Sequence, residues 1–286
     1  MKAKRKRKKR GGIWWLLLLS LLVVWTLWAN TALVVTRCTF VSQRVPAAFD
    51  GFVILQVSDL HDAELGEDNS EIADAAAQAQ PDIIVITGDH IDSNRLNIAR
   101  SLSLAARLAQ IAPVYYVTGN HEAALSNDNY TELKNGLAAA GVAVLEDGAV
   151  YIERGNDAIR LIGLNDLGFY KGTVPVKQQK LLKNLTLLND ESCFSLVLSH
   201  RPELIDIYAQ GKADLVLCGH AHGGQIRLPF IGGLYSPGQG MLPEYTSGLY
   251  RKGDTSIFVS RGIGNSKFPL RFNNRPELAV ITLKRG

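Results

Sequence analysis

Cysteine is scarce in this chain, and none of its three cysteines is placed to build a disulfide framework. Cys193 precedes the apolar run 195–199, and Cys218 ends the apolar run 214–218. If both runs are parallel strands, the two sulfur atoms lie at opposite ends of the strands and cannot meet. No lipoprotein acylation motif surrounds Cys38. We therefore expect three small buried or incidental residues.

The chain also lacks a serine-hydrolase elbow, because no Gly-x-Ser-x-Gly motif is present. It has no internal repeat, and acidic residues are absent from residues 2–10, where eight Lys or Arg stand. Subtracting these eight from the 31 basic residues leaves 23 against 27 acidic ones, so the body is mildly acidic although the whole chain carries +4. Such a basic tail is typical of nucleic-acid binding or nuclear import, but the residues that follow favour another role.

One long apolar run, residues 13–35, contains no charged side chain. A helix needs about 20 such residues to cross the hydrocarbon core of a bilayer. Trp14-Trp15 marks one end, and the basic residues before the run, with only Arg37 just after it, place the N-terminus in the cytoplasm. A cleaved signal peptide is the competing interpretation, but Ala29-Asn30-Thr31-Ala32 is a poor cleavage site. We expect an uncleaved, single-pass anchor in the cell membrane and an extracytoplasmic domain.

This assignment divides the chain into a basic cytoplasmic tail (1–12), a transmembrane anchor (13–35), a tether (36–46) and one globular domain (47–286). Strand-like and helix-like segments alternate in the domain, and its last part is rich in strands, which predicts an α/β layered fold. The expected strands are 52–57, 83–87, 114–118, 149–152, 158–163, 195–199, 214–218, 256–260 and 278–283, and the expected helices are 69–80, 96–110, 130–140 and 175–188.

Five of the predicted strands are followed at once by a short motif that contains Asp, Asn or His. Ligands of open α/β sheets bind outside the carboxyl ends of the strands, so the five motifs would meet at one edge. Each motif alone is weak evidence, since a lone His after a strand is more often structural. Together they indicate a site for two bridged metal ions and metal-assisted hydrolysis of a phosphate ester. The motifs are Asp59-Leu60-His61, Gly88-Asp89-His90, Gly119-Asn120-His121-Glu122, Ser199-His200 and Gly219-His220-Ala221-His222.

In this order the motifs resemble those of the calcineurin-like metallophosphoesterase superfamily, over roughly residues 50–286. Segments 219–225 and 269–277 are similar to its membrane-associated branch of YkuE- and YaeI-like phosphodiesterases. The resemblance implies an αββα sandwich, that is, two mixed β-sheets flanked by helices, here with an N-terminal transmembrane helix.

The same resemblance implies two metal ions, and these residue types suit Mn, Fe or Zn. A hydroxide that bridges the ions would attack phosphorus in line. The implied ligands are Asp59, His61 and His222 for one ion, Asn120, His200 and His220 for the other, and Asp89 as the bridge.

The resemblance gives His121 a different role, because it follows a ligand without being one. It would face the substrate and protonate the leaving oxygen. Glu122 either orients His121 or is structural. Arg201 either contacts phosphate or precedes a helix that begins at Pro202.

Other residues near the motifs receive simpler assignments. His90 stands where the superfamily commonly has an apolar residue, and we expect it to point to the opposite face rather than into the substrate pocket. We expect Asp62 and Glu64 to be solvated surface residues. Gly223 and Gly224 would let the backbone approach the metal ions.

The function that these observations favour is a membrane-anchored phosphoesterase, preferably a phosphodiesterase, with a phosphate ester and the lipid bilayer as partners. The acidic body and the membrane span oppose a nuclease, so no nucleic-acid partner is expected. Two alternatives stay open. One is a pyrophosphatase acting on a UDP-sugar lipid, which would need a cytoplasmic-face substrate. The other is a non-catalytic envelope binding module, which the full ligand set opposes.

Overall fold

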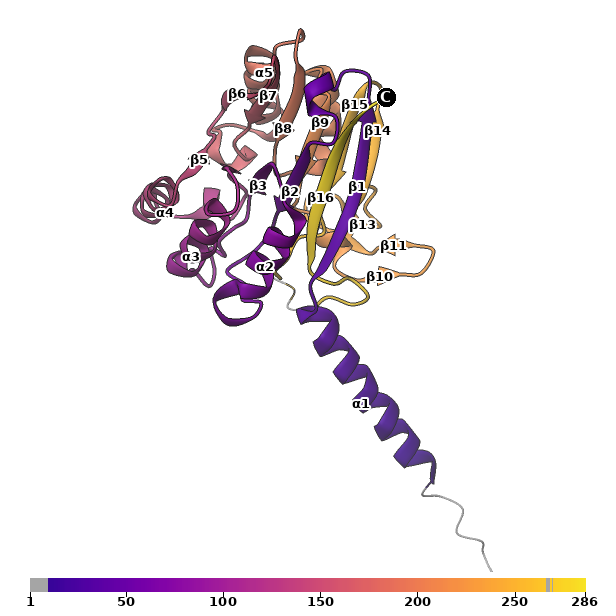
Figure 1. The fold of residues 1–286 in the computed structure, drawn as a ribbon. Helices are drawn as coiled ribbons and strands as arrows, with labels where there is room; N and C mark the ends of the chain where they lie inside the picture. The colour runs from indigo at the N-terminus through magenta and orange to yellow at the C-terminus, as the bar shows by residue number, and fades with distance from the viewer. Residues whose placement is uncertain (1–9, 266–267, 269) are drawn as a thin grey trace, which may run out of the picture.

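The computed structural model of the chain describes residues 10–265, 268 and 270–286. Two six-stranded β-sheets lie face to face, helices cover their outer faces, and one long helix projects from one end of the domain (Figure 1). This arrangement confirms the αββα sandwich that the resemblance implies.

Each sheet is mixed, as expected. In sheet A only the β16–β2 pair is antiparallel, and in sheet B only the two outer pairs are. Sheet A runs in the spatial order β1 (Val34–Ser42), β16 (Glu277–Arg285), β2 (Val53–Val57), β3 (Ile83–Thr87), β4 (Val114–Val117) and β5 (Val142–Val144). Sheet B runs β14 (Gly248–Lys252), β15 (Thr255–Val259), β9 (Leu215–Cys218), β8 (Phe194–Leu198), β7 (Asp157–Gly163) and β6 (Gly148–Arg154).

Two short hairpins follow β9 and had no expected counterpart. They consist of β10 (Arg227–Leu228) with β11 (Gly232–Gly233), and of β12 (Tyr235–Ser236) with β13 (Gly240–Met241).

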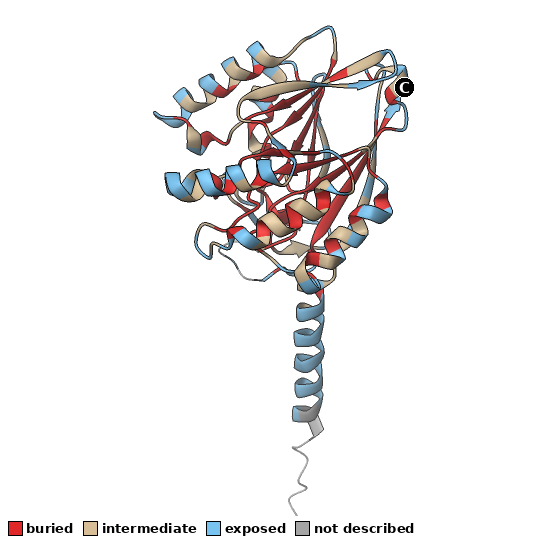
Figure 2. Cartoon of the chain, turned by 60° about the vertical axis from the view of Figure 1, so that its left-hand side comes forward, coloured by how far each residue is buried: buried red, intermediate tan, exposed pale blue. Residues whose placement is uncertain are grey.

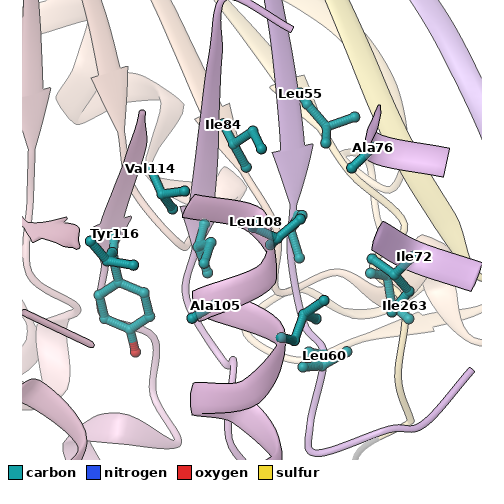
Figure 3. Packing of buried hydrophobic residues seen from close by; sticks show 14 of the residues in the cluster. Leu55, Leu60, Ile72, Ala76, Ile84, Ala105, Leu108, Val114, Tyr116 and Ile263 are labelled. Carbon is teal, nitrogen blue, oxygen red and sulfur yellow. The ribbon is translucent and has the colours of Figure 1, made fainter. Parts of the chain in front are cut away.

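Three buried apolar layers hold the sandwich together (Figure 2). Side chains alternate along each strand, so that Ile54 of β2 packs between the sheets with Leu196 of β8. Leu55 points the other way, into the outer layer that Ile84 and Leu108 share (Figure 3). Sheet A is covered by α2 (Ser70–Ala79), α3 (Ile98–Ala109) and α4 (Asn127–Ala139), and sheet B by α5 (Val174–Leu188) and α6 (Ile205–Gln210).

The prediction of a tether over residues 36–46 is wrong for most of that segment. Residues 34–42 form β1, which pairs in parallel with β16 from Val34 opposite Glu277 to Ser42 opposite Arg285. The β-branched residues at the start of this segment favour an extended strand. The β16 strand therefore lies between the first strand of the chain and β2.

The N-terminal helix α1 (Arg10–Thr31) ends four residues before the predicted limit at 35. It is the one helix among the described residues that is long and apolar enough to cross a membrane, with a mean hydropathy of 1.5 over Trp14–Thr31. Two residues separate its end from β1.

The three cysteines behave as expected. All are free thiols, and β8 and β9 are parallel, so Cys193 and Cys218 stand at opposite ends of these strands.

Candidate metal centre

Parallel strands deliver the five sequence motifs to one edge of the sandwich. Each motif begins within two residues of the carboxyl end of β2, β3, β4, β8 or β9. The side chains converge into groups whose ligand atoms lie within 4.8 Å of one another, and these groups include Asp59, His61 and His222, and Asp89, His200 and His220.

The first group contains two imidazoles that face each other. His61 Nε2 lies 3.1 Å from His222 Nε2, and His222 Nε2 lies 3.6 Å from Asp59 Oδ1. Burial lowers the pKa of His61 to about 4 and that of His222 to about 3, so both rings are neutral near pH 7. Two neutral imidazoles and a carboxylate directed at one point form a donor set that suits Zn, Fe or Mn.

The second group is built in the same way. His220 Nδ1 lies 3.1 Å from His200 Nε2, which lies 3.2 Å from Asp89 Oδ2. His200 Nδ1 donates to the carbonyl of Thr87 at 2.9 Å, so the ring is fixed with Nε2 toward the site. Burial opposes protonation of His200, but Asp89 outweighs it and raises the pKa of His200 to about 10. The negative charge of Asp89 thus favours a positive charge beside it, which a bound metal ion would supply.

Asp89 connects the two groups. Its Oδ2 lies 3.6 Å from His61 Nε2 of the first group and 3.2 Å from His200 Nε2 of the second. Its Oδ1 accepts the backbone N–H of His121 at 2.8 Å, which fixes the carboxylate. Despite burial, the neighbouring histidines hold the pKa of Asp89 well below its usual range.

Asn120 lies beside the second group and lines the same pocket as Asp89 and His220. Its side-chain Oδ1 is buried and has no hydrogen-bond partner in the structure, which is costly unless a cation or another donor binds it. This orphaned oxygen, together with the converging imidazoles and carboxylates, fits a pair of metal ions.

The backbone at these residues adopts a conformation that non-glycine residues seldom use. Asp59, His61, Asp89, His220 and His222 all have φ between 46° and 66°. Left-handed conformations at several non-glycine residues cost free energy, and they persist at sites where the surrounding structure enforces them. Gly219 precedes His220 at a position where a Cβ atom would overlap Ser58 Oγ and Asp59 Oδ2. Only glycine fits there.

His121 lies next to the first group, with its ring centroid 4.5 Å from that of His61. Its Nδ1 accepts the backbone N–H of Ser93 at 3.0 Å, so a neutral ring carries its proton on Nε2. Asp92 Oδ1 lies 3.4 Å from the same Nδ1. His61, Asp92 and His121 also form a group that could hold a metal ion, and Asp92 had no expected role.

Glu122 is structural. Its carboxylate accepts backbone N–H groups from Asp89 at 2.9 Å, His90 at 2.8 Å and Gly119 at 2.7 Å, and so joins the loops after β3 and β4. His90 is buried with Nε2 2.9 Å from the carbonyl of Ser101, outside the pocket, as expected.

The expectation that Asp62 is a solvated surface residue is wrong, because Asp62 is buried. It accepts backbone N–H groups from Asp92 at 2.9 Å and Asn97 at 3.0 Å, and the hydroxyl of Ser101 at 2.8 Å. Glu64 is exposed, as expected, and pairs with Arg100. The sequence carried no clear signal for Asp62, since its partners come from a loop and helix more than 25 residues away.

Arg201 precedes the short helix at Pro202–Leu204, and its side chain also reaches the site. The guanidinium binds Asp166 through two nitrogens, at 2.6 and 3.1 Å, and its Nη1 lies 3.3 Å from His220 Nε2. Asp166, which had no expected role, therefore holds Arg201 beside a proposed ligand.

We expected Gly223 and Gly224 to let the backbone approach metal ions, but the close contacts that require glycine at these positions are with other parts of the chain. A Cβ atom on Gly223 would overlap the side chain of Asn274, and one on Gly224 would overlap Gly233. These glycines instead let the C-terminal loop and the β11 strand pack closely on the segment after His222.

The groups open into a pocket of about 200 Å³. Polar side chains of the two groups line one part of it, which we call its floor. The rest is lined by Gln225, Tyr235, Pro237 and Phe268, of which Tyr235 and Phe268 are exposed to solvent. The site therefore combines a polar floor with a largely apolar remainder.

Comparisons with known proteins agree with this geometry. The calcineurin-like phosphoesterase family matches residues 52–224. The chain is 34% identical over 260 residues to the uncharacterized metallophosphoesterase YkuE of Bacillus subtilis, covering 87% of this chain and 85% of YkuE. It is 31% identical over 236 residues to phosphodiesterase YaeI of Escherichia coli, covering 81% and 82%. It is also 29% identical to a transmembrane protein with a metallophosphoesterase domain from Danio rerio, covering 85% of this chain and 56% of that protein.

Proposed function

Because the chain belongs to the calcineurin-like phosphoesterase family, and is thus a metal-dependent phosphoester hydrolase, we propose that it is a membrane-anchored phosphodiesterase with a two-metal centre. One observation carries the two-metal assignment. Asp89 Oδ2 faces His61 Nε2 on one side and His200 Nε2 on the other, at 3.6 and 3.2 Å. A carboxylate in this position offsets the repulsion between two cations.

The proposed ligands are those that the motifs predict. Asp59, His61 and His222 would hold one ion, Asn120, His200 and His220 the other, and Asp89, which lies between the two groups, would serve both. Bound ions of this kind withdraw charge from phosphate oxygens and make water a stronger nucleophile. Mn, Fe and Zn all suit the nitrogen and oxygen donors.

His121 is the proposed general acid. Ser93 orients the ring, which lines the pocket beside Asp89. Asp92 Oδ1, 3.4 Å from Nδ1, would stabilise the protonated ring that gives a proton to the leaving oxygen. Arg201, oriented by Asp166, holds positive charge next to His220 and would help to position an anionic substrate.

The proposed layout follows the described elements. Residues 1–12 form a cytoplasmic basic tail, α1 crosses the membrane, and the domain from β1 onward lies outside the cytoplasm. The apolar helix and the charge asymmetry around it support this layout. A transmembrane protein among the relatives is consistent with it.

The test of the metal centre is Asp89→Asn, with Asp128→Asn on the exposed surface as control. We expect two metal ions per chain in the wild type by elemental analysis. Asp89→Asn should lose metal and activity on bis(p-nitrophenyl) phosphate together, whereas Asp128→Asn should keep both. Full wild-type activity after exhaustive chelation would contradict the proposal.

A further inference from the structure

Large apolar side chains are exposed to solvent on the two hairpins and on the loop before β16, and one of them, Tyr235, also lines the pocket. We call this set the apolar rim, and it comprises Phe230, Ile231, Tyr235, Met241, Leu242 and Leu270. The two hairpins and the C-terminal loop bring the rim together, since Tyr235 pairs with Met241 across β12 and β13, and Ile226, just before β10, bridges to Phe272. An apolar patch next to a binding pocket on a soluble surface marks an interaction site.

The backbone of the rim supports a functional role. Phe230, between β10 and β11, has φ 68°, and Leu242, just after β13, has φ 53°. Bulky side chains seldom adopt this left-handed conformation, and Gly or Asn would do so at lower cost. Phe230 nevertheless projects fully into solvent. The chain thus keeps strained, exposed apolar residues where polar turn residues would be more stable.

The rim lies at the end of the domain from which α1 leaves. In Figure 1 the loop before β16 lies beside the top of α1, and the β10–β11 hairpin projects to the right at the same end of the domain. Asn30 of α1 donates to the carbonyl of Arg271 at 2.9 Å and accepts the backbone N–H of Arg271 at 2.6 Å. The Arg271 side chain reaches the metal centre, with Nη2 3.4 Å from His222 Nδ1. One residue therefore links the end of α1 to a proposed ligand.

The connection between α1 and the domain is too short to let the domain turn away. Only two residues separate Thr31 from Val34, and two residues span at most about 7 Å. Arg275 also holds the helix end, because its guanidinium lies 4.7 Å from the Trp28 ring and donates to the carbonyls of Ala32 and Leu33. Paired Arg and Trp side chains at a helix end are typical of the membrane–water interface.

We propose that the apolar rim inserts into the interface of the bilayer that holds α1, and that the substrate is a phosphate ester carried by a membrane lipid. The headgroup phosphate would reach the polar floor of the pocket, while the apolar part of the lipid lies along the rim. This inference rests on the proposed function. A bilayer is the partner we favour over a protein because α1 and its short connection hold the rim at the bilayer surface.

The first experiment locates the rim. Full-length protein with Cys38→Ser and Cys193→Ser receives one added cysteine, either Phe230→Cys at the rim or Leu187→Cys on α5, which is also exposed but lies at the far end of the domain. Each is labelled with the fluorophore NBD and placed in nanodiscs of phosphatidylglycerol and phosphatidylethanolamine. We expect blue-shifted emission and quenching by nitroxide lipids at 230 and neither at 187. A label at 230 that nitroxide lipids do not quench overturns the proposal, including the case of a blue shift from a protein contact.

The second experiment measures what the rim does for catalysis. Two substrates share one chemistry: bis(p-nitrophenyl) phosphate in solution, and the p-nitrophenyl phosphodiester of dioleoylglycerol in vesicles of the same lipids. For Phe230→Asp/Ile231→Asp, we expect the ratio of lipid-borne to soluble rate to fall roughly tenfold or more, because two large apolar side chains no longer partition into the interface. Leu187→Asp should leave the ratio unchanged.

The outcomes separate the two proposals. A wild type that hydrolyses neither substrate with added Mn, Fe or Zn contradicts the proposed function. A wild type that hydrolyses the soluble diester, with a ratio that the rim variant does not change, contradicts the lipid inference and leaves the phosphodiesterase intact.

Discussion

Glu122 Oε2 accepts the backbone N–H of Asp89 at 2.9 Å, and so one carboxylate fixes the loop that carries the proposed bridging ligand. The same oxygen accepts the N–H of Gly119 at 2.7 Å, which fixes the loop that carries Asn120. The two loops can therefore hold their ligands at a constant separation only while Glu122 is a hydrogen-bond acceptor.

We predict that Glu122→Gln lowers stability and metal content together. The amide replaces an acceptor with a donor and leaves buried N–H groups unpaired, which costs about 1–3 kcal/mol each. Denaturant unfolding and elemental analysis would measure both effects. Glu132→Gln on the exposed side of α4 serves as control and should match the wild type. Unchanged metal content in Glu122→Gln would show that the loops keep their geometry without this acceptor.

His121→Asn should separate acid catalysis from metal binding. If Nε2 protonates the leaving oxygen, the rate should fall roughly 10²–10⁴-fold on alkyl phosphodiesters, the usual range for a general acid. It should fall much less on p-nitrophenyl esters, since p-nitrophenol departs without a proton. Both metal ions should stay bound. Loss of an ion would instead assign His121 to the group formed with His61 and Asp92.

His90 should make the domain sensitive to mild acid. Burial lowers its pKa from 6.5 to about 4. Between these two pH values His90 is therefore protonated in the unfolded chain and neutral in the folded chain. The contribution of His90 to stability is therefore complete above pH 6.5 and is lost as the pH falls toward 4. That loss amounts to about 3 kcal/mol at pH 4.

The comparison variant is His90→Gln, which keeps an N–H donor for the Ser101 carbonyl. Unfolding of the metal-free protein between pH 7 and 4 should show a shallower decline for the variant than for the wild type. Parallel curves would mean that His90 takes up its proton equally in the folded and unfolded states.

The topology gives a fourth prediction. A C-terminal fusion to a reporter that works only outside the cytoplasm should be active, and the protein should stay with membranes at high salt. The reason is the excess of Lys and Arg before α1, which keeps that side in the cytoplasm. A reporter active only in its cytoplasmic form, or release of the protein by salt, would rule out this orientation.

Much of the architecture follows from local patterns. Buried parallel strands are continuous apolar runs, and for this reason β3 and the beginning of β4 match the expected segments residue for residue. Short or polar edge elements gave no such pattern. The apolar sequence of α1 continues into the start of β1, so the sequence shows no boundary between them. The alternating burial of β1 arises from its pairing with β16, which is distant in sequence.

The proposed ligands could be predicted from the sequence because each of their motifs closely follows an apolar strand. The residues that hold the ligands in place could not, since their partners are distant in sequence. Asp166 meets Arg201 across 35 positions, and Arg271 meets His222 across 49. Asp62 illustrates the same point, because a carboxylate near a turn is normally solvated unless buried N–H groups from elsewhere bind it.

The position of β16 also governs when the domain can form. Sheet A places the last strand of the chain between β1 and β2, which are the first two. The strand β1 can therefore pair with its neighbour only after β16 has been synthesised. If α1 enters the membrane first and the domain follows it across, the segment from β1 onward must cross before β16 can complete sheet A.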